Sequence, residues 1–145
     1  DQTSMRQTYN FRNVFARLAG EWVQQGNKQR AVEVLDRCMT ELPIESVPMN
    51  YYFLQIIEAY YDAGANDKAK MWCDKLLDQC EQELKYYSKY TGKDLKRVIQ
   101  DAEMDYQAFA VARSLAERNK EKDYADQILK RMEAFSALAS NFRGR

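Results

Sequence analysis

The sequence predicts an all-α protein built from antiparallel helical hairpins, and three observations support that prediction. The 145 residues include only five Gly and two Pro, while Ala, Leu, Glu, Lys and Gln, which favour helices, are common. Apolar residues recur at three- and four-residue spacing, as they do on one face of a helix. The stretch from Phe15 to Pro43 also returns in degenerate form from Phe53 to Cys80.

The first stretch predicts two helices joined by a tight turn. One apolar stripe ends before Gly26, and a second begins after Asn27. Gly26 suits the left-handed residue that ends a helix, and Asn27 can cap the next one. Pro43 stops the second helix because proline has no amide hydrogen. The stripes contain Phe15, Leu18, Ala19, Trp22 and Val23, then Ala31, Val34, Leu35, Cys38, Met39 and Leu42.

The second stretch repeats this arrangement 38 residues later, with Gly64 in the place of Gly26. Repeat distances of roughly 20–50 residues are typical of stacked helical units, which bury their apolar faces only against neighbours. The matching pairs are Phe15 with Phe53, Leu18 with Ile56, Ala19 with Ile57, Trp22 with Tyr60, Ala31 with Ala69, Leu35 with Cys73, and Cys38 with Leu76.

Six helices are expected along the chain, at about 9–25, 28–42, 49–63, 66–90, 94–118 and 121–142. They form three hairpins, at about 9–43, 49–90 and 94–142. Ser46 and Pro48 suit the start of the third helix, and Thr91-Gly92 breaks the fourth. Asn119 is expected to take the left-handed turn in the last hairpin. Ala125, Leu129 and Met132 then echo Ala31, Leu35 and Cys38 as a degenerate third copy.

These residues resemble the tetratricopeptide repeat, whose pattern places large, small and aromatic residues around a Gly, an Ala and a closing Pro. The first copy matches at Phe15, Leu18, Ala19, Trp22, Gly26, Ala31, Leu35, Cys38 and Pro43. The second matches at Phe53, Ile56, Tyr60, Gly64 and Ala69, and lacks the proline. The resemblance implies a single domain over residues 1–145. It would be a right-handed α–α superhelix of about three hairpins, the third with long flanking helices.

Composition narrows the classes of function. The formal net charge is zero and no basic block stands out, which disfavours nucleic-acid binding. No apolar run is long enough to span a membrane. The chain has no histidine and no CxxC, GxGxxG, P-loop or GxSxG motif, so we expect no catalytic, metal or cofactor site. Carboxylate pairs such as Asp101 with Asp105, and Asp78 with Glu81, are interpreted as solvated helix faces.

Cysteine usage favours packing. Cys73 and Cys80 lie about 10 Å apart along one helix, too far for a disulfide. Cys38 and Cys73 occupy near-equivalent positions, which leaves a disulfide between them as an alternative. The favoured interpretation is that all three are small buried hydrophobes.

A recognition surface is predicted on the face lined by the first helix of each hairpin. In each tyrosine doublet one ring faces the core and the other faces away, so Tyr51 and Tyr61 are expected to point outward. The alternative is that these tyrosines pack against the fourth and fifth helices. The basic clamp that some tetratricopeptide domains use for a peptide carboxylate is not evident, because Arg17 stands alone beside Glu58 and Asp62. The predicted surface comprises Asn13, Arg17, Gly20, Gln24, Tyr51, Gln55, Glu58, Tyr61 and Asp62.

A second, narrower resemblance covers about the first 90 residues. The runs MRQTYNFRNVFARLA, AVEVLDRCM and VPMNYYF resemble the soluble C-terminal region of a Bacteroidetes multi-pass membrane family. That family is similar to lipid-linked-sugar glycosyltransferases, including protein O-mannosyltransferases. The resemblance implies a soluble domain of a bacterial inner-membrane protein. It does not determine the side of the membrane, for which the periplasm is our guess. A start at Asp1 rather than Met fits an excised piece. None of the matched positions belongs to a catalytic motif.

Three hypotheses follow. The leading one is a non-catalytic scaffold module that binds a protein or peptide partner. The second is an accessory domain that positions an acceptor for a membrane glycosyltransferase, and the third is a structural domain that forms a weak homodimer.

Overall fold

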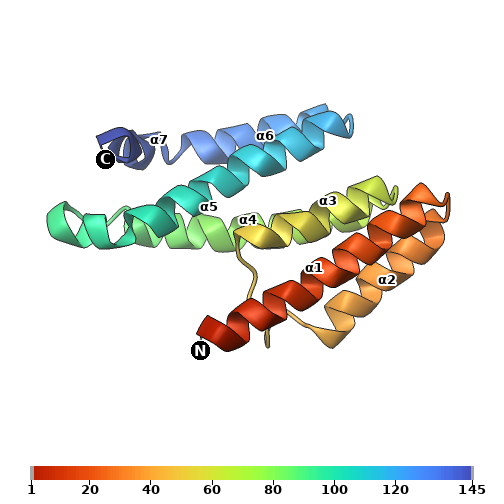
Figure 1. The fold of residues 1–145 in the computed structure, drawn as a ribbon. Coiled ribbons are helices and arrows are strands. Elements are labelled where there is room, and N and C mark those ends of the chain that lie inside the picture. The colour runs from red at the N-terminus through yellow and green to blue at the C-terminus, as the bar shows by residue number, and fades with distance from the viewer. Residues whose placement is uncertain (1, 145) are drawn as a thin grey trace. The chain divides into compact units, whose positions relative to one another are not determined.

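Helices make up nearly the whole of the computed structural model, which describes the backbone of residues 2–144 and the side chains of residues 12–142 (Figure 1). No strand occurs within that range. The α-helices are α1 (Gln2–Gln24), α2 (Lys28–Glu41), α3 (Leu54–Asp62), α4 (Asn66–Tyr87), α5 (Gly92–Arg118), α6 (Lys122–Glu133) and α7 (Ser136–Ala139). Two 3₁₀ helices, η1 (Tyr51–Phe53) and η2 (Ser140–Gly144), complete the set.

The chain forms two compact units, one ending at Cys73 and the other beginning at Asp74, and α4 continues through the boundary. In the first unit α1 packs against α2 and α3, and in the second α5 packs against α6 (Figure 1). None of the described helices is both long enough and apolar enough to cross a membrane.

The α1–α2 turn forms as predicted. Gly26 has a φ of +82°, and the amide of Asn27 donates to the carbonyl oxygen of Trp22 at 2.8 Å, which closes the helix in a Schellman motif. The Asn27 side chain caps α2 by accepting a hydrogen bond from the amide of Arg30 at 3.0 Å.

The same turn occurs at Gly64, with a φ of +76° and a bond from the Ala65 amide to the Tyr60 carbonyl oxygen at 2.9 Å. The third turn is centred on Lys120, with a φ of +63°, and the Glu121 amide donates to the Ala116 carbonyl oxygen at 2.8 Å. Gly26 and Gly64 are therefore equivalent residues, and the α5–α6 hairpin closes in the same way.

The prediction that Asn119 takes the left-handed turn is wrong. Asn119 has a φ of −100°, and its side-chain amide donates to the carbonyl oxygen of Leu115 at 2.8 Å. The turn falls one residue later because packing sets its position. In all three hairpins a fully enclosed alanine follows the left-handed residue by five positions, namely Ala31, Ala69 and Ala125, with exposures of 0 %, 0 % and 1 %.

Burial does not follow the repeat at every pair. Ile56 is 1 % exposed, whereas its counterpart Leu18 is 42 % exposed together with its neighbour Val14 at 48 %. Ile56 is enclosed in the core of the first unit, while this stretch of α1 turns outward. The two stretches therefore resemble each other more in their turns than in the burial of their apolar residues.

The link between α2 and α3 is held by a residue that the sequence does not single out. Arg12 is 4 % exposed, and its Nη2 donates to the carbonyl oxygens of Leu42 and Val47, each at 2.7 Å. Its guanidinium also lies 5.1 Å from the centre of the Phe53 ring. The guanidinium thus donates to one carbonyl oxygen at the C-terminal cap of α2, that of Leu42, and to one in the link that follows, that of Val47.

The third helix starts later than predicted. The cap is Asn50 rather than Ser46, since the Asn50 side chain accepts a hydrogen bond from the amide of Tyr52 at 3.0 Å. The 3₁₀ turn η1 then precedes α3, so the predicted helix from Met49 is shorter.

The predicted last helix, from Glu121 to Phe142, instead ends at Glu133. The amide of Phe135 bonds to the carbonyl oxygen of Met132 at 3.0 Å, which tightens the chain and redirects it into α7 and η2. Phe135 and Leu138 stay buried, and the ring of Phe142 lies 5.7 Å from that of Tyr106 on α5. The six predicted helices therefore become seven, because folding back lets this segment cover α5.

Candidate functional site

A groove of about 340 Å³ lies between α1 and α3 within the first unit. Small residues create it, since Ala16 and Gly20 line the α1 side and Ala59 lines the α3 side. A Cβ atom added at Gly20 would meet nothing within 4 Å, so the groove is open at that point. The remaining lining residues are Arg17, Gln55, Glu58 and Asp62.

The charged residues of this groove come from opposite walls. Arg17 projects from α1, and it makes no hydrogen bond or ion pair with another described residue. Glu58 and Asp62 stand four residues apart on α3, which places both carboxylates on one face of that helix. The groove lining therefore includes two anionic side chains and one cationic side chain.

The structure brings together about half of the predicted recognition surface. Arg17, Gly20, Gln55, Glu58 and Asp62 all line the groove. Asn13 and Gln24 share the α1 face without lining it, and Tyr51 packs edge-on against Tyr52 with ring centres 5.7 Å apart. Sequence reasoning missed Ala16 and Ala59, and the only available signal was their small size at positions one turn from Gly20 and Gln55.

The prediction that Tyr61 points outward is wrong, because Tyr61 is 3 % exposed. The doublet argument assumed one apolar stripe per helix. α3 is buried around most of its circumference, at Leu54, Ile56, Ile57, Ala59, Tyr60 and Tyr61. A helix that is apolar on nearly all sides belongs to the core.

The hydroxyl of Tyr60 joins three helices of the first unit. It donates to Asp36 Oδ1 on α2 at 2.8 Å, and Lys68 on α4 pairs with the other oxygen of the same carboxylate. Burial, followed by the hydrogen bond and charge of Asp36, raises the pKa of Tyr60 far above its ordinary value. This network ties α3, which forms one wall of the groove, to α2 and α4, and Tyr60 stays protonated at physiological pH.

The cysteines are free and buried, in agreement with the packing interpretation. Burial raises the pKa of Cys38 to about 11, so its thiol stays protonated and unreactive near neutral pH. Among the residues that the structure describes, no group of three or more Cys, Asp or Glu side chains could hold a metal ion.

One carboxylate pair departs from the solvated-face interpretation. Asp105 is half-buried between α4 and α5, and of its two carboxyl oxygens Oδ2 has no hydrogen-bond partner among the described residues. Burial is the main cause that raises the pKa of Asp105, to about 8. A hydrogen bond with Glu83 and the negative charge of Glu83 raise it further toward that value. Asp101, its predicted partner, is exposed. The site accordingly holds a proton at neutral pH.

Comparison with known proteins gives no assignment: no family model matches the chain, and neither the curated proteins nor the solved structures provide a match.

Proposed function

We propose that this chain is a non-catalytic protein-binding module built from hairpins of the tetratricopeptide type. The α1–α3 groove would hold a segment of the partner. The observation that carries the proposal is the convergence of Arg17, Gln55, Glu58 and Asp62 around a groove floored by small residues. The three equivalent turns support a repeated scaffold, which presents such surfaces without any catalytic group.

The charge of the groove selects the partner's chemistry. Two carboxylates on α3 face one guanidinium on α1, so a segment that carries a Lys or Arg side chain complements the groove better than an acidic one. The shallow floor at Gly20 and Ala59 admits the partner's backbone close to both helices. We therefore expect an extended basic segment rather than a C-terminal carboxylate.

A peptide-display selection against the full chain tests this proposal. The selected sequences should be enriched in Lys and Arg, and Gly20→Gln should abolish their binding because the added side chain fills the groove. Gly20→Ala is the matched control, since one methyl group enters open space and leaves the groove accessible. Selected peptides that bind Gly20→Gln as well as the unmodified chain would rule this groove out.

Weak self-association is a second candidate, favoured by the exposed pair Val14 and Leu18 on α1 and by Tyr52, which is 51 % exposed. Sedimentation velocity over a hundredfold concentration range distinguishes the two proposals. Self-association predicts a rising sedimentation coefficient that Leu18→Gln suppresses, whereas a monomeric module shows neither effect.

The wider role, as the soluble part of a membrane glycosyltransferase that positions an acceptor, rests on the narrower sequence resemblance. The reading frame upstream of these residues tests it directly. Several apolar segments of about 20 residues are expected there, and their absence would remove this role.

A further inference from the structure

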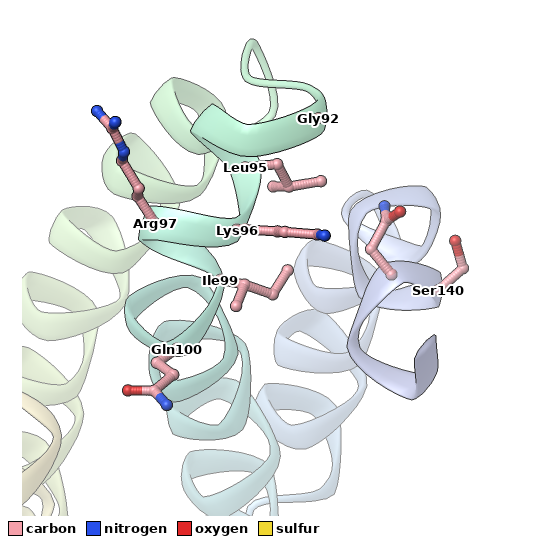
Figure 2. Close-up of a pocket in the computed structure, with 8 residues that line it drawn as sticks. Gly92, Leu95, Lys96, Arg97, Ile99, Gln100 and Ser140 are labelled. Atoms are coloured by element: carbon pink, nitrogen blue, oxygen red, sulfur yellow. The ribbon is translucent and has the colours of Figure 1, made fainter. Parts of the chain in front are cut away.

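A second and larger groove, of about 940 Å³, lies within the second unit, between the N-terminal half of α5 and the 3₁₀ helix η2 (Figure 2). Its volume falls at the upper end of the range of roughly 300–1,000 Å³ that binding sites occupy. The lining residues are Gly92, Leu95, Lys96, Arg97, Ile99, Gln100, Ser140 and Asn141.

Apolar and cationic side chains share the α5 wall of the groove. Leu95 and Ile99 stand one turn apart on α5, and Figure 2 shows both directed toward the η2 side. Lys96 extends from α5 in the same direction, toward the wall that carries Ser140 (Figure 2). Neither Lys96 nor Arg97 forms an ion pair or hydrogen bond with another described residue. Both cations therefore remain available to a ligand, and Figure 2 shows Lys96 directed toward the η2 wall and Arg97 directed to the other side of α5.

The positive charge extends beyond the groove. Residues 85–97 contain five basic side chains, at Lys85, Lys89, Lys93, Lys96 and Arg97, and one acidic side chain, at Asp94. All six are exposed. The net charge of the whole chain does not reveal this cluster of basic side chains, because acidic residues elsewhere bring that net charge to zero.

The first turn of α5 adds to this potential. Gly92 lines the groove, and the side chain of the cap residue Thr91 makes no hydrogen bond to the first-turn amides. A helix N-terminus favours negative charge, and here it reinforces the two cations beside it. On the opposite wall the Ser140 hydroxyl donates to the Ala137 carbonyl oxygen at 2.6 Å, which leaves its oxygen able to accept a bond from a ligand amide.

We propose that this groove binds a short acidic segment of another protein, with carboxylates on both sides of one apolar side chain. The apolar side chain contacts Leu95 and Ile99, one carboxylate meets Lys96 inside the groove, and a carboxylate on the other side approaches Arg97 at its edge. The concave form favours a peptide over a lipid surface, since a flat bilayer cannot reach the groove floor. None of the described residues that line the groove is aromatic, which argues against single-stranded nucleic acid, because stacking on aromatic rings supplies much of that binding.

The probe is a five-residue peptide with acetyl and amide ends, EELEE, titrated into the full ¹⁵N-labelled chain at low salt. We expect submillimolar binding, with amide shifts confined to residues 92–100 and 140–141. The peptide QQLQQ should lose binding, and EEAEE should bind more weakly because it lacks the apolar contact. Higher salt should weaken binding of EELEE, because the cations are exposed.

The double variant Lys96→Glu/Arg97→Glu should bind EELEE at least about tenfold more weakly, because attraction becomes repulsion. The control is Lys122→Glu, which changes another exposed lysine, at the start of α6. The end of α5 that leads to it lies roughly 30 Å from Lys96 at 1.5 Å per residue. Circular dichroism checks that each variant stays folded.

Several outcomes would overturn the proposal. They are equal binding of QQLQQ and EELEE, equal binding of EEAEE and EELEE, shifts outside the groove, or unchanged affinity in the double variant. Phosphatidylserine vesicles and a single-stranded oligonucleotide form two further arms. Binding to either that depends on Lys96 and Arg97, without binding of EELEE, would replace the peptide by a lipid or nucleic-acid ligand.

Discussion

The half-buried carboxyl group of Asp105 predicts an unusual dependence of stability on pH. Asp105 lies between α4 and α5, where burial and the neighbouring Glu83 raise its pKa to about 8. The negative charge of Asp101 acts in the same direction, while a hydrogen bond from Cys80 acts against it. The folded protein therefore holds a proton that the unfolded chain releases near pH 4.

The sign follows from proton linkage. Between about pH 4 and pH 8 the folded state binds more protons than the unfolded state, so stability falls as pH rises through this window and levels off above it. The full pKa shift from 3.8 corresponds to about 6 kcal/mol at roughly 1.4 kcal/mol per unit. Because Glu83 shares the proton and water reaches a half-buried site, we expect a loss of about 2 kcal/mol.

The substitution Asp105→Asn removes the titrating group and keeps the shape of the side chain. Urea unfolding at pH 5, 7 and 9 should show the loss of stability in the unmodified chain and its absence in Asp105→Asn. The matched control is Asp126→Asn on α6, whose exposed carboxylate should leave the pH dependence in place. Hydrogen exchange of α5 amides provides a local measurement of the same effect.

Two results would refute the reasoning. One is a free energy of unfolding that stays constant or rises from pH 5 to pH 9 in the unmodified chain. The other is an Asp105→Asn variant whose stability still falls with pH as before.

Four further substitutions test other parts of the structure. Gly20→Ala should stabilise the chain by about 0.5–1 kcal/mol in calorimetry, since alanine favours a helix interior and its methyl group meets no neighbour. A loss of stability would contradict the conclusion that the groove is open at this position. Lys120→Gly should raise stability by about 1 kcal/mol, because glycine adopts the left-handed backbone without strain. Gly26→Ala should lower stability by a similar amount for the same reason. Changes of the same sign in both variants would argue against equivalent turns. Arg12→Met should cost about 2–4 kcal/mol in urea unfolding, because the part-buried carbonyl oxygens of Leu42 and Val47 lose a charged donor. A change below about 1 kcal/mol would show that water replaces it.

The turns and helices of the hairpins could be predicted from the sequence because their causes are local. Gly26 and Asn27 carry the conformational preference and the capping group that the turn needs, and both act within a few residues. Lys120 shows where this reasoning ends. Local preference favours Asn119 for the left-handed position, yet the enclosed Ala125 fixes the turn one residue later at the cost of a strained lysine.

The burial of individual side chains could not be predicted, because it depends on which elements meet. Tyr61 and Leu18 illustrate the two directions of error, since an expected surface tyrosine is enclosed and an expected core leucine is exposed. Arg12 lies 30 residues from one of its carbonyl acceptors and 35 from the other, so no sequence pattern marks it. The candidate site was found in part because helical spacing already places Glu58 and Asp62 on one face.

The two grooves explain why a balanced composition is a poor guide to binding. The α1–α3 groove presents Glu58 and Asp62 against a single Arg17, whereas the α5–η2 groove presents Lys96 and Arg97 without a carboxylate. At physiological salt, exposed charges act over about 8 Å, so a ligand senses the groove it enters and not the net charge of the chain. The grooves thus call for partners of opposite charge. Peptides that bind each one should fail to compete, and reversing the charge of one groove should leave binding at the other intact.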